Sequence, residues 1–140
     1  MQIINKILEA IHNKNLPEAL ACFTEDATLI DPHYPYPTMR GLENIRAGLD
    51  WSMQGMKTFH FEIVRLYPLP ETQHYAVETH CEHMMRIGKE LVFDQVFLVE
   101  LENNKIKSLR AFEPYRPNGL LGILLTLNHV VYRLTHKQCK

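Results

Sequence analysis

The stretch NLPEALACFTEDATLIDP spans residues 15–32 and combines a short helix with a short strand. Pro17 suits the first turn of the helix. The side chains that this helix is expected to bury are Leu16, Ala19, Leu20 and Phe23. Asp26 to Asp31 form a predicted strand, which Pro32 closes because its ring cannot continue a hydrogen-bonded ladder. The expected unit is a helix, an acidic turn and a strand that ends in Asp-Pro.

Helical patterns flank this stretch on both sides. Upstream, apolar residues recur at helical spacing and form one stripe: Ile3, Ile4, Ile7, Leu8 and Ile11. Downstream, three prolines make residues 32–37 a stiff, irregular loop that carries His33, Tyr34 and Tyr36. A third helix is expected after Gly41. Its apolar face comprises Leu42, Ile45, Leu49, Met53 and Met56.

From Lys57 onward, the apolar period changes from about 3.6 residues to 2, as in strands. Four strands are predicted, over residues 57–67, 73–87, 90–102 and 105–113. Gly88-Lys89 suits a two-residue type II′ hairpin, and Asn103-Asn104 suits type I′. Helices followed by an antiparallel meander indicate an α+β fold. A strongly curved antiparallel sheet under helices encloses a cone, whose open end is a natural small-molecule pocket.

A last, strongly apolar helix is expected over residues 118–136, packed on the domain formed by residues 1–117. Its apolar positions cover more than half of the circumference, which is more than one packing surface needs. The first interpretation is that it covers the mouth of the cone and also takes part in a dimer contact. The second is a peripheral membrane contact, for which only Arg133, Lys137 and Lys140 supply firm positive charge.

The composition is that of a single globular domain. The chain has 140 residues, 46% of them apolar, and a formal net charge of −1. No bulk positive field exists to hold a phosphate backbone, so nucleic acid is not an expected partner. Three distant cysteines without a CxxC motif indicate reduced thiols in a cytoplasmic protein. The first residues lack a signal-peptide pattern, and no stretch predicts a spanning helix.

Three segments together resemble the nuclear transport factor 2-like superfamily, also called the SnoaL-like fold. They are NLPEALACFTEDATLIDP at 15–32, the proline loop that runs into MRGLENI at 39–45, and ENNKIKSLRAFEP at 102–114. The resemblance covers about residues 1–115. It implies a cone-shaped domain of the cystatin-like type, a fold that hosts many different functions.

Within this superfamily the nearest enzyme analogy is ketosteroid isomerase. That resemblance places Asp31 on the general base, which moves a proton beside a ketone. The family's oxyanion hole uses a first-helix tyrosine and a protonated strand acid; the matching positions here are near Ile7 and at Phe97, or at Gln95 if the register slips. SnoaL-like polyketide cyclases use an acid near the end of the final strand, where this chain has Glu113.

Limonene-epoxide hydrolases share the fold and use an Arg-x-Asp pair with a further aspartate on the last strand. Here His80-x-Glu82 stands at the pair, and Ala111 stands near the last-strand position. Alternate residues of a strand face opposite ways, so His80 and Glu82 share one face, while Cys81 and His83 share the other.

Which of these two faces lines the pocket has two interpretations. The apolar set Tyr75, Val77, Met85 and Ile87 favours the odd-numbered face. The two-residue turn instead places His80 opposite Phe97 and Glu82 opposite Gln95, and we favour this second register. A solvated or dimer-facing charge ladder is the alternative role for this strand.

The predicted function is binding of a small, largely apolar molecule, with isomerase-, cyclase- or hydrolase-type acid–base turnover as a possible extension. The alternative is a non-catalytic carrier or dimeric interaction module. The candidate catalytic residues are Asp31, Glu82 and His80. The candidate ligand-binding residues are His33, Tyr34, Tyr36, Gln95, Phe93, Phe97 and Glu113. No cofactor and no metal are expected, since zinc-ligand spacings are absent. A homodimer is predicted through the exposed sheet face at Val92, Val96 and Leu98.

Overall fold

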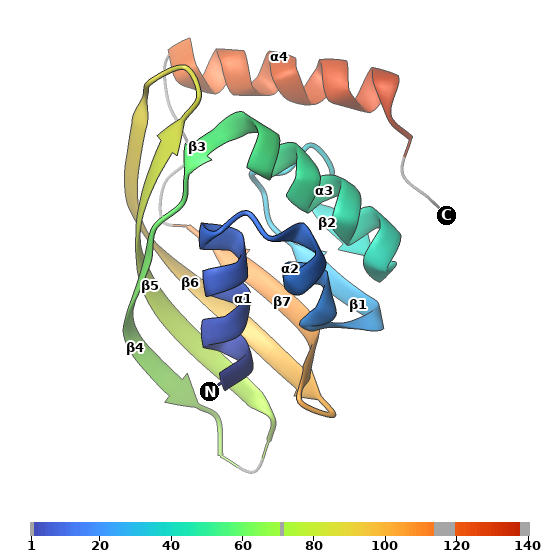
Figure 1. The fold of residues 1–140 in the computed structure, drawn as a ribbon, viewed down its shortest axis with the longest axis vertical. Helices are drawn as coiled ribbons and strands as arrows, with labels where there is room; N and C mark the ends of the chain where they lie inside the picture. The colour runs from blue at the N-terminus through green and yellow to red at the C-terminus, as the bar shows by residue number, and fades with distance from the viewer. Residues whose placement is uncertain (1, 71, 114–119, 138–140) are drawn as a thin grey trace.

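The structure is a computed structural model that describes residues 2–70, 72–113 and 120–137. Helices α1 (Gln2–His12), α2 (Leu16–Ala21) and α3 (Gly41–Gly55) lie against one face of a curved sheet (Figure 1). Helix α4 (Leu120–Thr135) lies across one end of the molecule, beyond α3. The α+β architecture expected from the sequence is therefore confirmed. The predicted boundary at residue 117 falls in 114–119, outside the described residues.

Seven strands form the sheet: β1 (Phe23–Ile30), β2 (Thr38–Arg40), β3 (Met56–Thr58), β4 (Phe61–Pro68), β5 (His74–Met85), β6 (Glu90–Glu102) and β7 (Lys105–Phe112). Their order is β2-β1-β7-β6-β5-β3, and β4 also pairs with β5. All pairs are antiparallel except β1 with β7, which is parallel. The parallel pair, the short β2 and the split of predicted strand 57–67 into β3 and β4 were not expected.

Of the two predicted hairpin turns, the one at Asn103-Asn104 is confirmed and the one at Gly88-Lys89 is not. Asn103 and Asn104 have positive φ angles of 52° and 59° and close a two-residue loop, as type I′ requires. The turn at Gly88 is different, because the N–H of Met85 donates to the carbonyl of Lys89 across three residues, with Gly88 at φ 82°. The predicted two-residue type II′ turn is therefore wrong, and the register between β5 and β6 changes with it.

Helix α3 packs closely on the proline loop at Gly48. A Cβ atom built at Gly48 would lie 2.1 Å from Sδ of Met39 and 3.2 Å from Cδ1 of Tyr34. Both neighbours are held in the interior: Met39 is buried, and the hydroxyl of Tyr34 donates to Ser52 Oγ at 3.3 Å. The absence of a side chain at position 48 thus allows the loop that follows Asp31 to lie against α3.

We expect Gly48→Ala to lower the free energy of unfolding by about 1–3 kcal/mol, because the added methyl group overpacks this contact. Chemical denaturation followed by circular dichroism measures the change. Gly55→Ala is the matched control, since nothing lies within 4 Å of a Cβ there. Its free energy of unfolding should stay the same or rise by up to about 1 kcal/mol. Equal stability of Gly48→Ala and the native chain would contradict the packing argument.

Candidate functional site

A cavity of about 680 Å³ lies between the helices and the inner face of the sheet. Its wall is mostly apolar and includes Ile7, Leu29, Leu49, Phe59, Phe61, Phe97 and Leu109. Leu125 of α4 also borders it, so this helix covers part of the opening. The volume is within the range of about 300–1,000 Å³ that is typical of small-molecule sites. The cone therefore leaves a hollow large enough for a drug-sized molecule.

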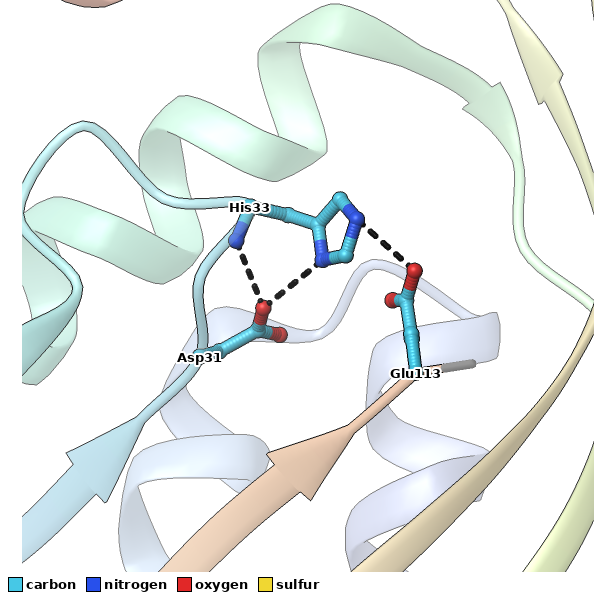
Figure 2. Close-up of side chains that lie close together, drawn as sticks. All are labelled: Asp31, His33 and Glu113. Atoms are coloured by element: carbon cyan, nitrogen blue, oxygen red, sulfur yellow. Dashed lines mark hydrogen bonds and ion pairs between the residues drawn. The ribbon is translucent and has the colours of Figure 1, made fainter. Parts of the chain in front are cut away.

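Asp31 reaches the cavity because β1 ends one residue before it. Pro32 stops the strand, and Asp31 Oδ1 accepts a hydrogen bond from the backbone N–H of His33 at 2.9 Å. The same oxygen lies 3.0 Å from Nδ1 of His33 (Figure 2). Asp31 is thus both the turn-forming residue and a carboxylate in the cavity wall, two roles that the sequence presents as alternatives.

Glu113 comes from the other strand of the parallel pair. Ile30 of β1 pairs near Arg110 of β7, so both strands end at the same edge of the sheet. Glu113, the first residue after β7, lies with its Oε2 2.7 Å from Nε2 of His33. Figure 2 shows the imidazole of His33 between the two carboxylates. The parallel pairing thus brings together three predicted site residues from opposite ends of the chain: Asp31, His33 and Glu113.

The His33 imidazole carries a positive charge at neutral pH. Its burial lowers its pKa, but the hydrogen bonds and charges of Asp31 and Glu113 outweigh this effect and raise the pKa to about 9. The three side chains are only 27%, 14% and 10% exposed for His33, Asp31 and Glu113, respectively. The cluster is therefore a partly buried imidazolium that bridges two carboxylates, a group able to exchange protons with a bound molecule.

The same three residues are the one group of three or more His, Cys, Asp and Glu side chains within the described ranges whose ligand atoms all lie within 4.8 Å of one another. Each ring nitrogen of His33 already faces a carboxylate, however. A divalent ion would have to displace one of the two N–H protons that the ring donates to these carboxylates, because only a neutral imidazole coordinates a metal. The arrangement therefore fits an ion pair better than a metal centre.

Most of the remaining predicted residues also border the cavity: Tyr34, Phe93, Gln95 and Phe97. The ring of Phe93 stacks on His33 at 6.5 Å between centroids, and burial raises the pKa of the Tyr34 phenol. Tyr36 lies elsewhere, at a second cavity of about 250 Å³ between the proline loop, α3 and α4. Its hydroxyl donates to the backbone carbonyl of His136, so it fixes α4 to the loop.

His80 and Glu82 do not face the inside of the cone as the favoured register predicted. His80 pairs with Asp94 and Glu82 with Val92, not with Phe97 and Gln95. Because the turn at Gly88 has three residues, odd-numbered positions of β5 pair with odd-numbered positions of β6. His80 borders the cavity opening, where its Nδ1 lies 2.7 Å from Asp94 in an exposed pair. The predicted register of both residues is wrong, although His80 does border the cavity, and the buried positions of β5 are the odd-numbered ones.

With the odd-numbered residues of β5 facing inward, His83 lies in the cavity wall. His83 is not among the candidate residues predicted from the sequence. His83 is 7% exposed, and its ring contacts Phe59, Phe61 and Phe93. The signal was present in the alternation of Tyr75, Val77 and Met85, which marks the odd-numbered face as apolar. Trp51 was also missed: it borders the cavity, and its indole Nε1 donates to Asn128 of α4 at 3.1 Å.

The apolar α4 helix presents a second feature, on its outer side. Its exposed large apolar side chains are Ile123, Leu124, Leu127, Val130, Val131 and Leu134. Among the described helices, none is long and apolar enough to cross a membrane. Among the contacts of α4 with the rest of the chain are the hydrogen bond from Trp51 to Asn128, that of Arg133 Nε with the Pro35 carbonyl, and that of the Tyr132 hydroxyl with the Ala47 carbonyl.

Comparison with known proteins gives one family and many similar folds. The family model described as SnoaL-like domain matches residues 4–109. No curated protein matches the chain. Delta 5-3-ketosteroid isomerase from Mycobacterium sp. has a similar structure, with a TM-score of 0.71, 16% identity and coverage of 79% of this chain and 89% of that one.

Two ligand-binding structures are similar to the same extent. RV0760c from Mycobacterium tuberculosis, in complex with estradiol-17beta-hemisuccinate, has a TM-score of 0.70 at 14% identity and covers 79% of this chain and 89% of its own. A computationally designed 17-OHP binder has a TM-score of 0.70 at 14% identity, with coverage of 79% and 88%. At these identities, the likeness concerns the fold alone.

Proposed function

This chain belongs to the SnoaL-like domain family, and from that premise we propose that it binds a small, largely apolar molecule in the cavity between the helices and the sheet. The observation that carries the proposal is the cavity itself: about 680 Å³, walled by apolar and aromatic side chains, with a polar cluster at one position. Such a combination is typical of ligand sites, in which the apolar wall supplies affinity and few polar groups fix orientation. Similar folds that bind estradiol-17beta-hemisuccinate and 17-OHP support a ligand of this kind.

We further propose that the cluster transfers a proton to and from the bound molecule. Asp31 Oδ1 accepts two hydrogen bonds from His33, but no hydrogen bond within the described residues involves Asp31 Oδ2. That oxygen is available to take a proton from a carbon beside a carbonyl group. The His33 imidazolium holds the carboxylate in place, and Glu113 holds the other side of the ring. A carrier with no turnover is the second candidate, and it shares the cavity but not the proton transfer.

The predicted homodimer and cytoplasmic location stay predictions. Exposed apolar side chains on the outer sheet face favour a dimer contact there: Val96, Leu98 and Phe112. Val92, which the predicted contact includes, is exposed but also borders the cavity. Glu82 lies on the outer side and His80 borders the cavity opening, and neither takes part in the proposed proton transfer.

The binding proposal predicts thermal stabilisation by an apolar ligand that depends on open space in the cavity. With 17-OHP at about 100 times its dissociation constant, the free energy of unfolding should rise by about 2.7 kcal/mol. Leu109→Trp should abolish this rise, because Leu109 borders the cavity and a larger ring would occupy it. Differential scanning fluorimetry over a series of ligand concentrations measures the effect.

Val64→Trp is the control, since Val64 on β4 is 49% exposed and does not border the cavity. It should respond to 17-OHP as the native chain does. Equal stabilisation of the native chain and of a folded Leu109→Trp variant would place the binding site outside this cavity. Native mass spectrometry of the purified protein tests the same proposal with whatever ligand the cell supplies.

A further inference from the structure

His83 stands in an aromatic enclosure at the cavity wall. Its ring centroid lies 5.2 Å from that of Phe59, 4.9 Å from Phe61 and 5.3 Å from Phe93, each in an edge-on arrangement. The residue is 7% exposed and borders the cavity. An imidazole costs free energy in such surroundings unless its polar atoms find partners. A ring nitrogen of His83 that lacks a protein partner is therefore the atom available to a bound molecule.

The ring is neutral at physiological pH. Burial lowers its pKa to about 4, against a smaller opposing effect of the Glu82 backbone carbonyl, and the nearby His60 lowers it further. Nδ1 accepts a hydrogen bond from the backbone N–H of His60 at 3.4 Å, an N–H that also donates to the Glu82 carbonyl at 3.0 Å. A nitrogen that accepts cannot carry the proton of a neutral ring, so the hydrogen bond from His60 favours the tautomer with the proton on Nε2.

Among the described residues, the side-chain hydrogen bond of the His83 ring is made at Nδ1, and none is made at Nε2. Among these residues, the one fully buried side-chain polar atom without a partner is Nε2 of His129. His83 Nε2 is therefore not sealed in protein, and the accessible space beside this buried residue is the cavity. The amide nitrogen of Gln95 also makes no hydrogen bond within the described residues. Gln95 is 5% exposed, and the hydrogen bond of its side chain is accepted by Oε1 from the Cys81 thiol.

We propose that His83 is a specificity residue of this cavity, whose Nε2–H donates a hydrogen bond to an uncharged oxygen, such as that of a ketone or quinone, on the bound molecule. This inference rests on the proposed binding function. An uncharged donor between three phenyl rings cannot offset the cost of burying an anion, so a carboxylate at this position is disfavoured. The ligand class is thus an apolar, preferably aromatic molecule with a carbonyl oxygen directed at His83.

The test compares two probes of one shape, 2-acetylnaphthalene and 2-ethylnaphthalene, in which a carbonyl replaces a methylene group. The native chain should bind the ketone more tightly than the hydrocarbon by roughly threefold to tenfold, the effect of one neutral hydrogen bond. His83→Phe should remove this preference while it keeps the affinity for 2-ethylnaphthalene. Titration calorimetry measures both dissociation constants.

His83→Gln, which keeps an N–H donor, should retain part of the preference, and His60→Gln, a change at an exposed histidine, should retain all of it. Nitrogen NMR of the native chain needs no variant. It should show the Nε2–H tautomer of His83, and the Nε2 resonance should shift when the ketone is added. If both probes bind and His83→Phe leaves the preference unchanged, or if the proton lies on Nδ1, this inference is overturned while the binding function stands. If neither probe binds the native chain, both fail together.

Discussion

Raising the pH from about 6 to about 10 should remove about 3 kcal/mol of folding stability through His33 alone. The folded-state pKa is about 9, above the ordinary value of 6.5, so the folded protein binds this proton more tightly than the unfolded chain. The stabilisation is therefore complete below about pH 6.5 and is lost as the pH rises through 9. A difference of about 2.5 pKa units corresponds to about 3 kcal/mol at 1.36 kcal/mol per unit.

The measurement is the free energy of unfolding of the native chain minus that of His33→Gln, across this pH range. Subtraction removes the tyrosines, lysines and thiols that also titrate at high pH. We expect this difference to fall by about 3 kcal/mol between about pH 6 and about pH 10. His74→Gln, which removes a half-exposed histidine paired with Glu100, is the matched control for the loss of a histidine. A difference that stays flat, or an NMR titration of His33 centred near 6.5, would contradict the bridged imidazolium.

The three residues of this cluster were each predictable, but their meeting was not. Asp31 and Glu113 stand next to prolines at strand ends, which is a local pattern that a single sequence shows. Their proximity depends on the parallel pairing of β1 with β7, between segments about 80 residues apart. Periodicity carries no information on which strands pair. The sequence therefore predicts three separate roles: Asp31 as a base, His33 as a ligand contact and Glu113 as an acid.

The misplacement of His80 and Glu82 has an equally specific cause. Gly88-Lys89 is compatible with a two-residue hairpin, and one further residue in the loop reverses which faces of two strands coincide. The apolar alternation on β5 is a longer pattern than the turn and gave the correct face. Where the two disagree, burial of a whole strand face outweighs turn chemistry, because each misplaced large apolar side chain costs about 1.5–3 kcal/mol.

Asp31→Asn should reduce proton transfer by about 10²- to 10⁴-fold, the usual contribution of a positioned general base. The assay is hydrogen–deuterium exchange of 2-tetralone in D₂O, followed by proton NMR. A C–H bond beside the ketone breaks, its electron pair enters the enolate, and the proton moves to Asp31 Oδ2. Solvent replaces that proton with a deuteron, which returns to the carbon, so no other reactant is needed. The enolate oxygen requires N–H donors, and Gln95 and His83 border the same cavity.

The variant separates chemistry from folding because asparagine retains the oxygen that accepts the His33 backbone N–H and closes the turn. Affinity for 2-tetralone should therefore change by no more than about threefold, while the exchange rate falls. Asp26→Asn is the control, since Asp26 is 70% exposed and pairs with Lys107 away from the cavity. Undiminished exchange in Asp31→Asn would remove Asp31 as the base. Binding of 2-tetralone by the native chain with exchange no faster than in buffer would favour the carrier, because the cavity would then hold a ketone beside a carboxylate that does not act on it.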